Sequence, residues 1–343
     1  MNQQSIQEIL NGRVQLKKFS KYFANHAKQR QKKLTKPNGS LGNLEDYAIW
    51  LAGWQHTRTP TIRNPLCLVF AANHGVANRG VSAYPQEVTE QMVKNFEAGG
   101  AAINQLCNLA NVKLSVIPIE LENPTKDFSR ESAMTIAETE LAMQIGFDSV
   151  PQDTDLLILG EMGISNTCAA TAISCVLFNQ TIKSWTGIGT GLSKDKLKKK
   201  ISIISYGIEL HGRNFNKVEQ ILSAFGGREM AAIAGAVVAA RLRGVPVLLD
   251  GFVSTASAAS LIIFKRNILD HCLISHLSTE PGHRGIIKKL KKDPILDLNL
   301  RLGEASGGVI ASMILKSAVV THNGMSTFSE ANISQKNSHA DFS

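Results

Sequence analysis

A glutamate before a helical pattern and a glycine-rich turn have the residue types that acid–base chemistry on a phosphorylated ligand requires. The segment GEMGISNTCAATAI, residues 160–173, has the form of a strand end, a glycine turn and a helix start. Such a turn directs free backbone N–H groups at one point, and the helix dipole favours an anion there. The segment predicts a phosphate site with added donors from Ser165, Asn166 and Thr167. A plain N-cap made by one of these three side chains is the alternative.

Glu304 follows Gly303 and precedes a long apolar helical pattern in RLGEASGGVIASMILKSA, residues 301–318. A carboxylate in the first turn of a helix is stabilised by the helix dipole, which is a sufficient structural reason for its presence. The same position suits a general base, because the dipole would keep the group ionised at neutral pH. The spacing alone leaves both interpretations open.

Two further motifs are less specific. GIGTGLSKDKLKKK, residues 187–200, lacks the spacing of a dinucleotide fingerprint, although one of its lysines could reach a phosphate. His74, in ANHGV, could be catalytic, structural or a ligand. No second histidine has metal-ligand spacing and no hydrolase pattern occurs, so we expect neither a metal site nor a cofactor.

Short apolar runs rich in β-branched residues predict six buried strands. They span residues 66–71, 113–119, 155–160, 183–188, 246–251 and 271–275. Helical patterns separate them, and this alternation predicts a parallel sheet covered by helices on both faces. In such a sheet, ligands bind beyond the carboxyl ends of the strands. Glycine and polar residues follow most of these runs, as a ligand site at that edge requires.

The two ends of the chain show helical periodicity without a convincing strand. We therefore expect residues 56–293 to form a large α/β substrate-binding domain. Residues 1–55 and 294–343 should pack together as a small helical domain or layer.

Composition narrows the function classes. The 343 residues are 43% hydrophobic and 19% charged, which is typical of a globular protein of one or two domains. No apolar run is long enough for a membrane span, and the N-terminus lacks the apolar core of a signal peptide, so we expect a cytoplasmic protein. The net charge is +9, but the basic runs 194–200 and 288–292 contain no aromatic residue. They favour solvated helix faces over a nucleic-acid site. Five scattered cysteines indicate reduced thiols.

Seven segments, taken in order, resemble one enzyme family. They are KPNGSLGNLE (36–45), FAANHGVANRGVSAYPQEVT (70–89), GEMGISNT (160–167), GIGTGL (187–192), PVLLDGFVS (246–254), SHLSTEPGH (275–283) and RLGEASGG (301–308). The family is nicotinate-nucleotide–dimethylbenzimidazole phosphoribosyltransferase, which acts in the assembly of the cobalamin nucleotide loop. The match spans nearly the whole chain and depends on no single motif.

The resemblance implies a three-layer α/β/α domain with a mainly parallel, Rossmann-like sheet, a small helical domain and a homodimer without a cofactor. It implies that Glu304 is the general base and Glu161 a second active-site carboxylate. It places the nicotinate group near Ser278. The implied phosphate ligands are Gly163, Ile164, Asn166, Thr167 and Lys200. The implied benzimidazole pocket includes Tyr84, Pro85, Met92 and Leu302.

This sequence departs from the family pattern at three positions. Asn73 stands where the family often has aspartate, and the helix start NTCAAT, residues 166–171, contains Cys168 and lacks the family's usual proline. The position held by Tyr84 varies within the family. These departures leave the reaction class intact and put the preferred base in doubt. The alternatives are a related enzyme using adenine, another benzimidazole or a phenol, and a non-catalytic nucleotide-binding protein; retention of both Glu161 and Glu304 argues against the latter.

Overall fold

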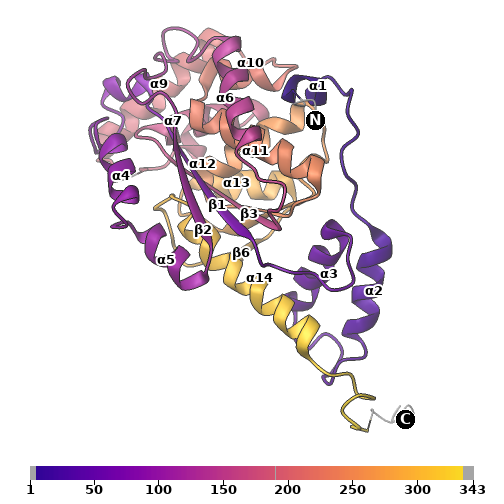
Figure 1. The fold of residues 1–343 in the computed structure, drawn as a ribbon. Coiled ribbons are helices and arrows are strands. Elements are labelled where there is room, and N and C mark those ends of the chain that lie inside the picture. Colours follow the sequence, from indigo (N-terminus) through magenta and orange to yellow (C-terminus); the bar gives the residue numbers. More distant parts are fainter. Residues whose placement is uncertain (1–4, 190, 335–343) are drawn as a thin grey trace, which may run out of the picture. The chain divides into compact units, whose positions relative to one another are not determined.

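A parallel β-sheet forms the centre of the larger part of the protein. The computed structural model describes residues 5–189 and 191–334 (Figure 1). The described strands are β1 (Pro65–Ala71), β2 (Lys113–Pro118), β3 (Leu156–Met162), β4 (Val247–Leu249), β5 (Cys272–His276) and β6 (Pro294–Leu296). They run in the order β2-β1-β3-β4-β5-β6, and every neighbouring pair is parallel. The predicted parallel sheet is confirmed.

Helices alternate with the strands along the chain, as the sequence predicted. They are α1 (Ile6–Leu10), α2 (Lys21–Gln31), α3 (Asn43–Gln55), α4 (Val88–Glu97), α5 (Ala102–Ala110), α6 (Ile136–Asp148), α7 (Asn166–Leu177), α8 (Ile182–Trp185), α9 (Lys194–His211), α10 (Val218–Phe225), α11 (Arg228–Arg243), α12 (Phe252–Ala259), α13 (Pro281–Leu290) and α14 (Ser306–Gly324). Two short 3-10 helices, Gly75–Arg79 and Ser260–Ile263, follow β1 and α12.

The alternating side chains of β3 show how both faces of the sheet are covered. Leu157 and Leu159 belong to the main hydrophobic core, on the face where α11 and α12 pack. Residues 158 and 160 point to the opposite face. There, a Cβ on Gly160 would lie only 2.2 Å from the backbone nitrogen of Ala305. Glycine at position 160 therefore allows the chain that enters α14 to lie directly against the strand, which completes the three-layer α/β fold.

The described chain forms two compact units. One contains the described residues up to Lys17 together with Asn64–Ser312, and the other contains Lys18–Arg63 with the described residues from Met313 onward. The sequence analysis expected residues 1–55 and 294–343 in the small helical part, but residues 294–312 belong to the sheet unit and residues 56–63 to the helical unit. The first segment belongs instead to the sheet unit, because Ile6 and Ile9 of α1 are buried in its core.

The second unit is helical. It contains α2, α3 and the C-terminal end of α14. The Arg30 side chain of α2 donates hydrogen bonds to the carbonyls of His322, Asn323 and Met325. These bonds satisfy carbonyl groups that a helix leaves without intrahelical partners at its C-terminal end.

Two strand assignments differ from the sequence expectation. Residues 183–188 do not form a strand, because Ile182–Trp185 is the short helix α8 and β3 pairs directly with β4. The run contains β-branched and aromatic residues, but Trp185 is buried against α13, where a Cβ on Gly285 would meet its ring at 2.4 Å. The strand β6, at Pro294–Leu296, was not predicted, because its three residues are too few to show a period.

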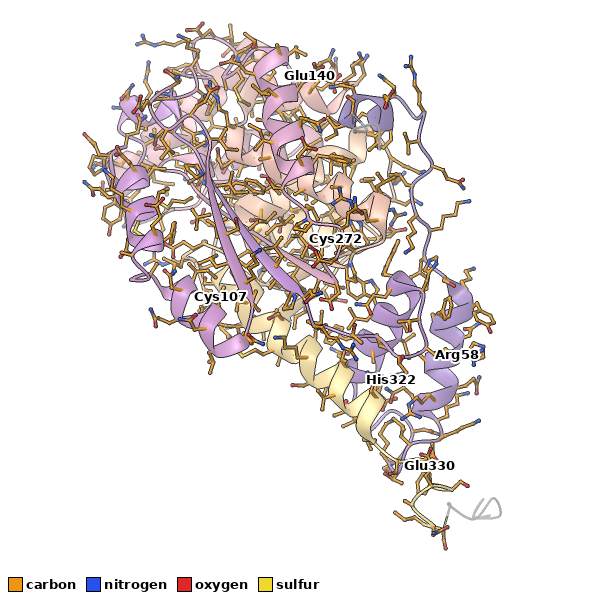
Figure 2. The ribbon with its side chains drawn as sticks, in the orientation of Figure 1. Arg58, Cys107, Glu140, Cys272, His322 and Glu330 are labelled. Atoms are coloured by element: carbon orange, nitrogen blue, oxygen red, sulfur yellow. The ribbon has the colours of Figure 1, made fainter. Side chains whose placement is uncertain are left out.

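All five cysteines are free, as the sequence indicated, and all five are buried. Cys107 lies on α5 and Cys272 on β5 (Figure 2). Within the described residues, no helix has both the length and the apolar character needed to cross a membrane.

Candidate active site

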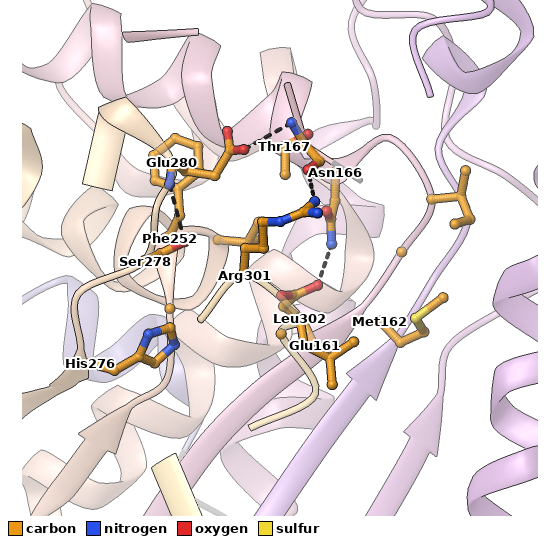
Figure 3. A pocket seen from close by; sticks show the side chains of 16 residues that line it. Glu161, Met162, Asn166, Thr167, Phe252, His276, Ser278, Glu280, Arg301 and Leu302 are labelled. Atoms are coloured by element: carbon orange, nitrogen blue, oxygen red, sulfur yellow. Dashed lines mark hydrogen bonds between the residues drawn. The ribbon is translucent and has the colours of Figure 1, made fainter. Parts of the chain in front are cut away.

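A cavity opens at the carboxyl edge of the sheet, where the strand order predicts a ligand site (Figure 3). It is bordered by residues at the ends of β3, β4 and β5 and by the segment 301–303, which leads into α14. The lining residues are Glu161, Met162, Gly163, Ile164, Asn166, Thr167, Gly189, Gly251, Phe252, Val253, His276, Ser278, Glu280, Arg301, Leu302 and Gly303. Parallel strands bring these residues together although they are far apart in the sequence.

The turn between β3 and α7 forms one wall of the cavity. Four of its residues line that wall: Gly163, Ile164, Asn166 and Thr167. Ser165 is the N-cap residue of α7, but its side chain makes no capping hydrogen bond and its φ is +78°. Asn166 donates its amide N–H to Glu161 Oε2 instead of capping the helix (Figure 3). The turn therefore has the geometry of an anion site at a helix N-terminus, and capping does not explain its polar residues.

Lys200 lies behind this wall. Its side chain is fully buried, and Nζ donates to Thr167 Oγ1 at 2.8 Å and to the Gly187 carbonyl at 3.2 Å. The other lysines of the run 194–200 are exposed, so Lys200 is the lysine of that run that faces the turn. It connects the β3–α7 turn to the glycine loop that follows α8.

Glu280 holds that glycine loop from the other side. Its Oε1 accepts the N–H of Gly189 at 2.8 Å, and a Cβ on Gly187 would lie 2.2 Å from Oε2. The sequence analysis did not single out this carboxylate. Its place four residues after the end of β5 was the available signal, because that position belongs to the ligand-binding edge.

Glu161 is the penultimate residue of β3 and lines the cavity. Burial raises its pKa to about 8, and the neighbouring carboxylates of Glu229, Asp250 and Glu304 contribute to the increase, while the Asn166 hydrogen bond opposes it. Its carboxyl group is therefore mostly protonated at neutral pH.

Glu304 occupies a strained turn immediately before α14. Its φ is +62° and that of Ala305 is +65°, a conformation that costs about 1–3 kcal/mol for each non-glycine residue. The backbone N–H of Glu304 donates to the carbonyl of Glu161 at 3.3 Å. The side chain is buried and is not itself one of the lining residues, whereas Arg301, Leu302 and Gly303 are. Backbone strain of this kind is typical of functional sites.

The expected ionisation of Glu304 by a helix dipole was wrong. The helix α14 begins at Ser306, so Glu304 precedes its first turn. Burial raises the pKa of Glu304 to about 7, and the charge of Asp250 adds to this effect. A carboxyl group with this pKa is partly protonated at neutral pH. A general base works best when its pKa lies close to the working pH in this way.

Asp250 and His276 complete the polar group at this edge, and the sequence analysis assigned neither of them a role. Asp250 is fully buried, and its Oδ1 accepts the N–H of Gly308 at 2.9 Å. Burial raises its pKa to about 7, against the opposing effect of hydrogen bonds from the start of α14. His276 Nε2 lies 3.5 Å from Asp250 Oδ1, and burial lowers the pKa of this histidine. Both residues lie at strand ends, which was the signal for finding them.

The remaining predicted residues fall into two groups. Ser278 and Leu302 line the cavity, and Ser278 Oγ accepts the N–H of Glu280 at 3.3 Å. Three others do not line it: Tyr84, Pro85 and Met92. They lie on α4 or on the segment before it, and their role stays a prediction.

Two contacts involve the end of β1 and the start of α4. Thr89 Oγ1 of α4 accepts the N–H of Ile164 at 3.2 Å, which ties that helix to the β3–α7 turn. His74 is buried and pairs with Glu229 Oε1 at 2.7 Å, so its contact is structural.

In the described part of the chain, no three His, Cys, Asp or Glu side chains are grouped in a way that could hold a metal ion.

Most of the chain matches known proteins. A family model described as phosphoribosyltransferase matches residues 16–333. The nicotinate-nucleotide–dimethylbenzimidazole phosphoribosyltransferase of Ruegeria pomeroyi is 50% identical over 308 residues, which cover 90% of this chain and 91% of the relative. The enzyme of the same name from Methylorubrum extorquens is 48% identical over 310 residues, with the same coverage. This chain belongs to that family.

A solved member of the family has the same fold. The crystal structure of the enzyme from Thermus thermophilus superposes with a TM-score of 0.86 at 34% identity, and the match covers 92% of this chain and 100% of that chain. The predicted family and the predicted three-layer α/β fold are confirmed.

Asn73 and Cys168, two departures from the family pattern, both fit into the structure. Asn73 Nδ2 donates to the carbonyl of Leu121 at 2.8 Å, a bond that an aspartate could not donate. Cys168 lies in the first turn of α7, where it is fully buried, and burial raises the pKa of its thiol to about 11. It is therefore an inert core residue.

Proposed function

We propose that this chain moves the 5-phosphoribosyl group of nicotinate mononucleotide to 5,6-dimethylbenzimidazole. The products are nicotinate and α-ribazole 5′-phosphate, which supplies the lower ligand of cobalamin. The observation that carries the proposal is the setting of Glu304, a buried carboxyl group in a strained turn with a pKa of about 7, next to the cavity. Membership of the family supports this pair of substrates.

Glu304 acts as the general base of the reaction. It accepts the ring N–H proton of the benzimidazole, and the other ring nitrogen of the base attacks C1′ of the ribose. The bond from C1′ to the pyridinium nitrogen breaks, and nicotinate leaves with that electron pair as a neutral ring. Attack from the opposite face inverts the β-linked donor to the α-linked product. General-base help of this kind contributes about 10²–10⁴-fold, and the alignment of three groups supplies much of the rest.

The donor binds with its phosphate at the β3–α7 turn. Its proposed ligands are Gly163, Ile164, Asn166 and Thr167, with Lys200 supporting Thr167 from behind. The nicotinate group lies near Ser278, and Leu302 contributes to the benzimidazole pocket together with Tyr84, Pro85 and Met92.

Glu161 is the second carboxyl group of the site. With a pKa of about 8 it is protonated at neutral pH, so it can donate a hydrogen bond to a substrate without adding negative charge. A neutral Glu161 also avoids repelling the proton acceptor Glu304. The two carboxyl groups thus have different tasks, because their environments give them different pKa values.

We further propose a homodimer in the cytoplasm, with small molecules as substrates and with neither a nucleic acid nor a membrane as partner. The basic run at the start of α9 supports the absence of a nucleic-acid partner, because its lysines other than Lys200 are solvent-exposed and no aromatic residue lies among them. Light scattering coupled to size-exclusion chromatography tests the dimer directly, because a monomer of 37.2 kDa is clearly resolved from a pair.

Product analysis tests the function. The purified chain is incubated with nicotinate mononucleotide and, separately, with dimethylbenzimidazole, adenine, another benzimidazole and a phenol. The proposal expects α-ribazole 5′-phosphate and the fastest turnover with dimethylbenzimidazole. Faster turnover with another base would show that the proposed acceptor is wrong. Ligand binding without any transfer product would show that the chain is a binding protein and not an enzyme.

A further inference from the structure

The lining of the cavity contains more acidic than basic side chains, although the donor that it is proposed to bind carries a negative phosphate. Two glutamates line it, Glu161 and Glu280, and Arg301 is the one lysine or arginine among its described lining residues. Lys200 is fully buried behind Thr167 and is not part of the lining. A mononucleotide carries a phosphate dianion, and a cation in direct contact would strengthen its binding beyond what the backbone N–H groups of the turn supply.

Arg301 points at the phosphate end of the cavity. Its Nη1 donates to the carbonyl of Gly189 at 3.2 Å, across the opening (Figure 3). Gly189 is adjacent to the phosphate turn, since a Cβ on it would lie 3.3 Å from Thr167 Oγ1. The guanidinium group therefore lies beside the turn that predicts a phosphate site, although Arg301 enters the cavity from the segment between β6 and α14.

The present partner of Arg301 is weak and replaceable. Arg301 is exposed, and the bond to Gly189 is a single contact with a neutral carbonyl. A phosphate oxygen is a stronger acceptor for a guanidinium group, and it permits a bidentate contact. Gly189 does not depend on Arg301, because its N–H is held by Glu280 at 2.8 Å. The arginine can leave the glycine loop while the loop keeps its second attachment.

We infer that Arg301 is a phosphate-binding residue that moves from the Gly189 carbonyl to the 5′-phosphate of the donor. This inference rests on the proposed function for the identity of the donor. The exchange places a cation over the phosphate from the side opposite Lys200 and leaves Glu280 holding the loop. No covalent bond forms or breaks in this step.

Binding measurements with matched ligands test the inference. Calorimetry compares nicotinate mononucleotide with nicotinate riboside, which lacks only the phosphate, for the wild type, Arg301→Met and Arg301→Lys. We expect Arg301→Met to weaken mononucleotide binding by about 10- to 100-fold, the range for a lost hydrogen bond to a charged group. Its affinity for the riboside should stay within about twofold of the wild type, and Arg301→Lys should recover part of the loss.

Arg284→Met is the matched control, because Arg284 is exposed on α13 and does not line the cavity. It removes the same charge and should change neither affinity. Equal weakening of mononucleotide and riboside by Arg301→Met would overturn the inference, as would unchanged binding of both ligands.

Two further ligands separate this result from related explanations. Nicotinamide mononucleotide keeps the phosphate and lacks the carboxylate, so Arg301→Met should weaken it as much as it weakens nicotinate mononucleotide. A loss confined to the ligand with the carboxylate would overturn the phosphate assignment. Ribose 5-phosphate reports on the same contact without any base, so the inference about Arg301 can hold even if wild-type turnover shows that the proposed donor is wrong.

Discussion

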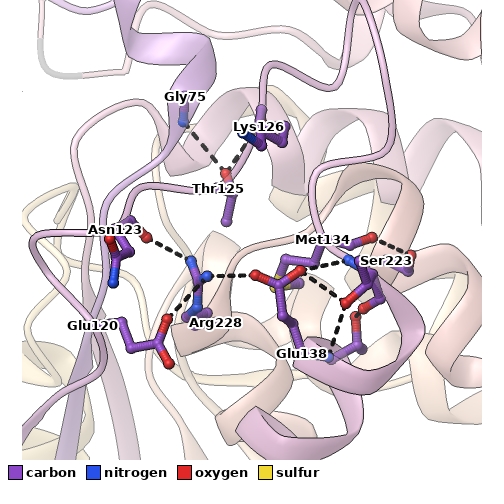
Figure 4. A network of polar contacts seen from close by, with 11 residues as sticks. Gly75, Glu120, Asn123, Thr125, Lys126, Met134, Glu138, Ser223 and Arg228 are labelled. Atoms are coloured by element: carbon purple, nitrogen blue, oxygen red, sulfur yellow. Dashed lines mark hydrogen bonds and ion pairs between the residues drawn. The ribbon is translucent and has the colours of Figure 1, made fainter.

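Two groups of carboxylates in the sheet unit have opposite surroundings. One is the Arg228 network, formed by Arg228, Glu120, Glu138 and Asn123 (Figure 4). In it, Arg228 Nη2 lies 3.1 Å from Glu120 Oε2 and 2.8 Å from Glu138 Oε1. In the cavity group, formed by Glu161, Asp250 and Glu304, no described lysine or arginine makes an ion pair with any member. The first group has a buried cation, and the second has none among the described residues.

The titration of the two groups differs accordingly. Backbone hydrogen bonding from Thr135 lowers the pKa of Glu138, and Arg228 lowers it further. Burial raises the pKa values of Glu161, Asp250 and Glu304 to about 8, 7 and 7. The ion pairs of the Arg228 network fasten the segment after β2 to α6 and α11. The cavity group can gain and lose protons near neutral pH, and that ability is what proton transfer requires.

The largest expected effect tests whether the cavity group does chemistry. Glu304→Gln should lower kcat by about 10²–10⁴-fold, because the amide cannot accept the proton. Donor binding should persist, since the β3–α7 turn that we propose to bind the phosphate is untouched. Steady-state kinetics and calorimetry measure the two properties separately. Glu138→Gln is the control from the Arg228 network and should keep a normal kcat. A Glu304→Gln enzyme with near-normal turnover would remove this residue from the mechanism.

The next effect concerns pH. A general base must be ionised, and Glu304 has a pKa of about 7, so kcat/KM should fall about tenfold for each pH unit below that value. Glu138 of the Arg228 network titrates lower and should not contribute to this decline. The pH profile of kcat/KM measured with the wild-type enzyme shows this decline at acidic pH directly. A flat profile from neutral pH to about pH 5 would be inconsistent with a base of this kind.

A smaller effect is expected from breaking the Arg228 network. Arg228→Met leaves Glu120 and Glu138 without their cation and should lower the free energy of unfolding by about 2 kcal/mol, a value limited by the solvent exposure of both glutamates. Urea denaturation measures it. Arg228→Lys keeps the charge and should lose less. Because this network lies outside the cavity lining, kcat of the folded variant should be unchanged, and a large loss of kcat would contradict the division between the groups.

The smallest effect is a change in how stability depends on pH. The folded-state pKa of Glu161, about 8, lies above the ordinary value of 4.5. Its contribution to the free energy of unfolding is therefore full below pH 4.5 and is lost as the pH rises to 8. Glu161→Gln stays neutral and should become more stable relative to the wild type between pH 7 and 8, by at most about 1.4 kcal/mol. Denaturation at both pH values measures the difference. Glu122→Gln, at an exposed position, should show no such trend.

Particular residues show how far the sequence could predict this protein. The runs that became β1, β2, β3, β4 and β5 were apolar enough to be recognised, and the rule for parallel sheets placed the cavity at their carboxyl ends. The run 183–188 failed because its strand-forming residues are used to bury Trp185 against α13. Glu280 and Asp250 lie in segments that were recognised, but their contacts with Gly189 and Gly308 come from chain positions 91 and 58 residues away.

The sequence by itself determined the alternation of strands and helices, the family and the edge of the sheet that carries the polar residues, since these follow from local periodicity and from the order of motifs. Only the tertiary structure decided the protonation of the carboxyl groups. The pKa of Glu304 depends on its burial and on the charge of Asp250, which is distant in the chain and close in the folded state. A local interpretation of Glu304 predicted an ionised residue at a helix start, and folding made it a buried acid that titrates near neutral pH.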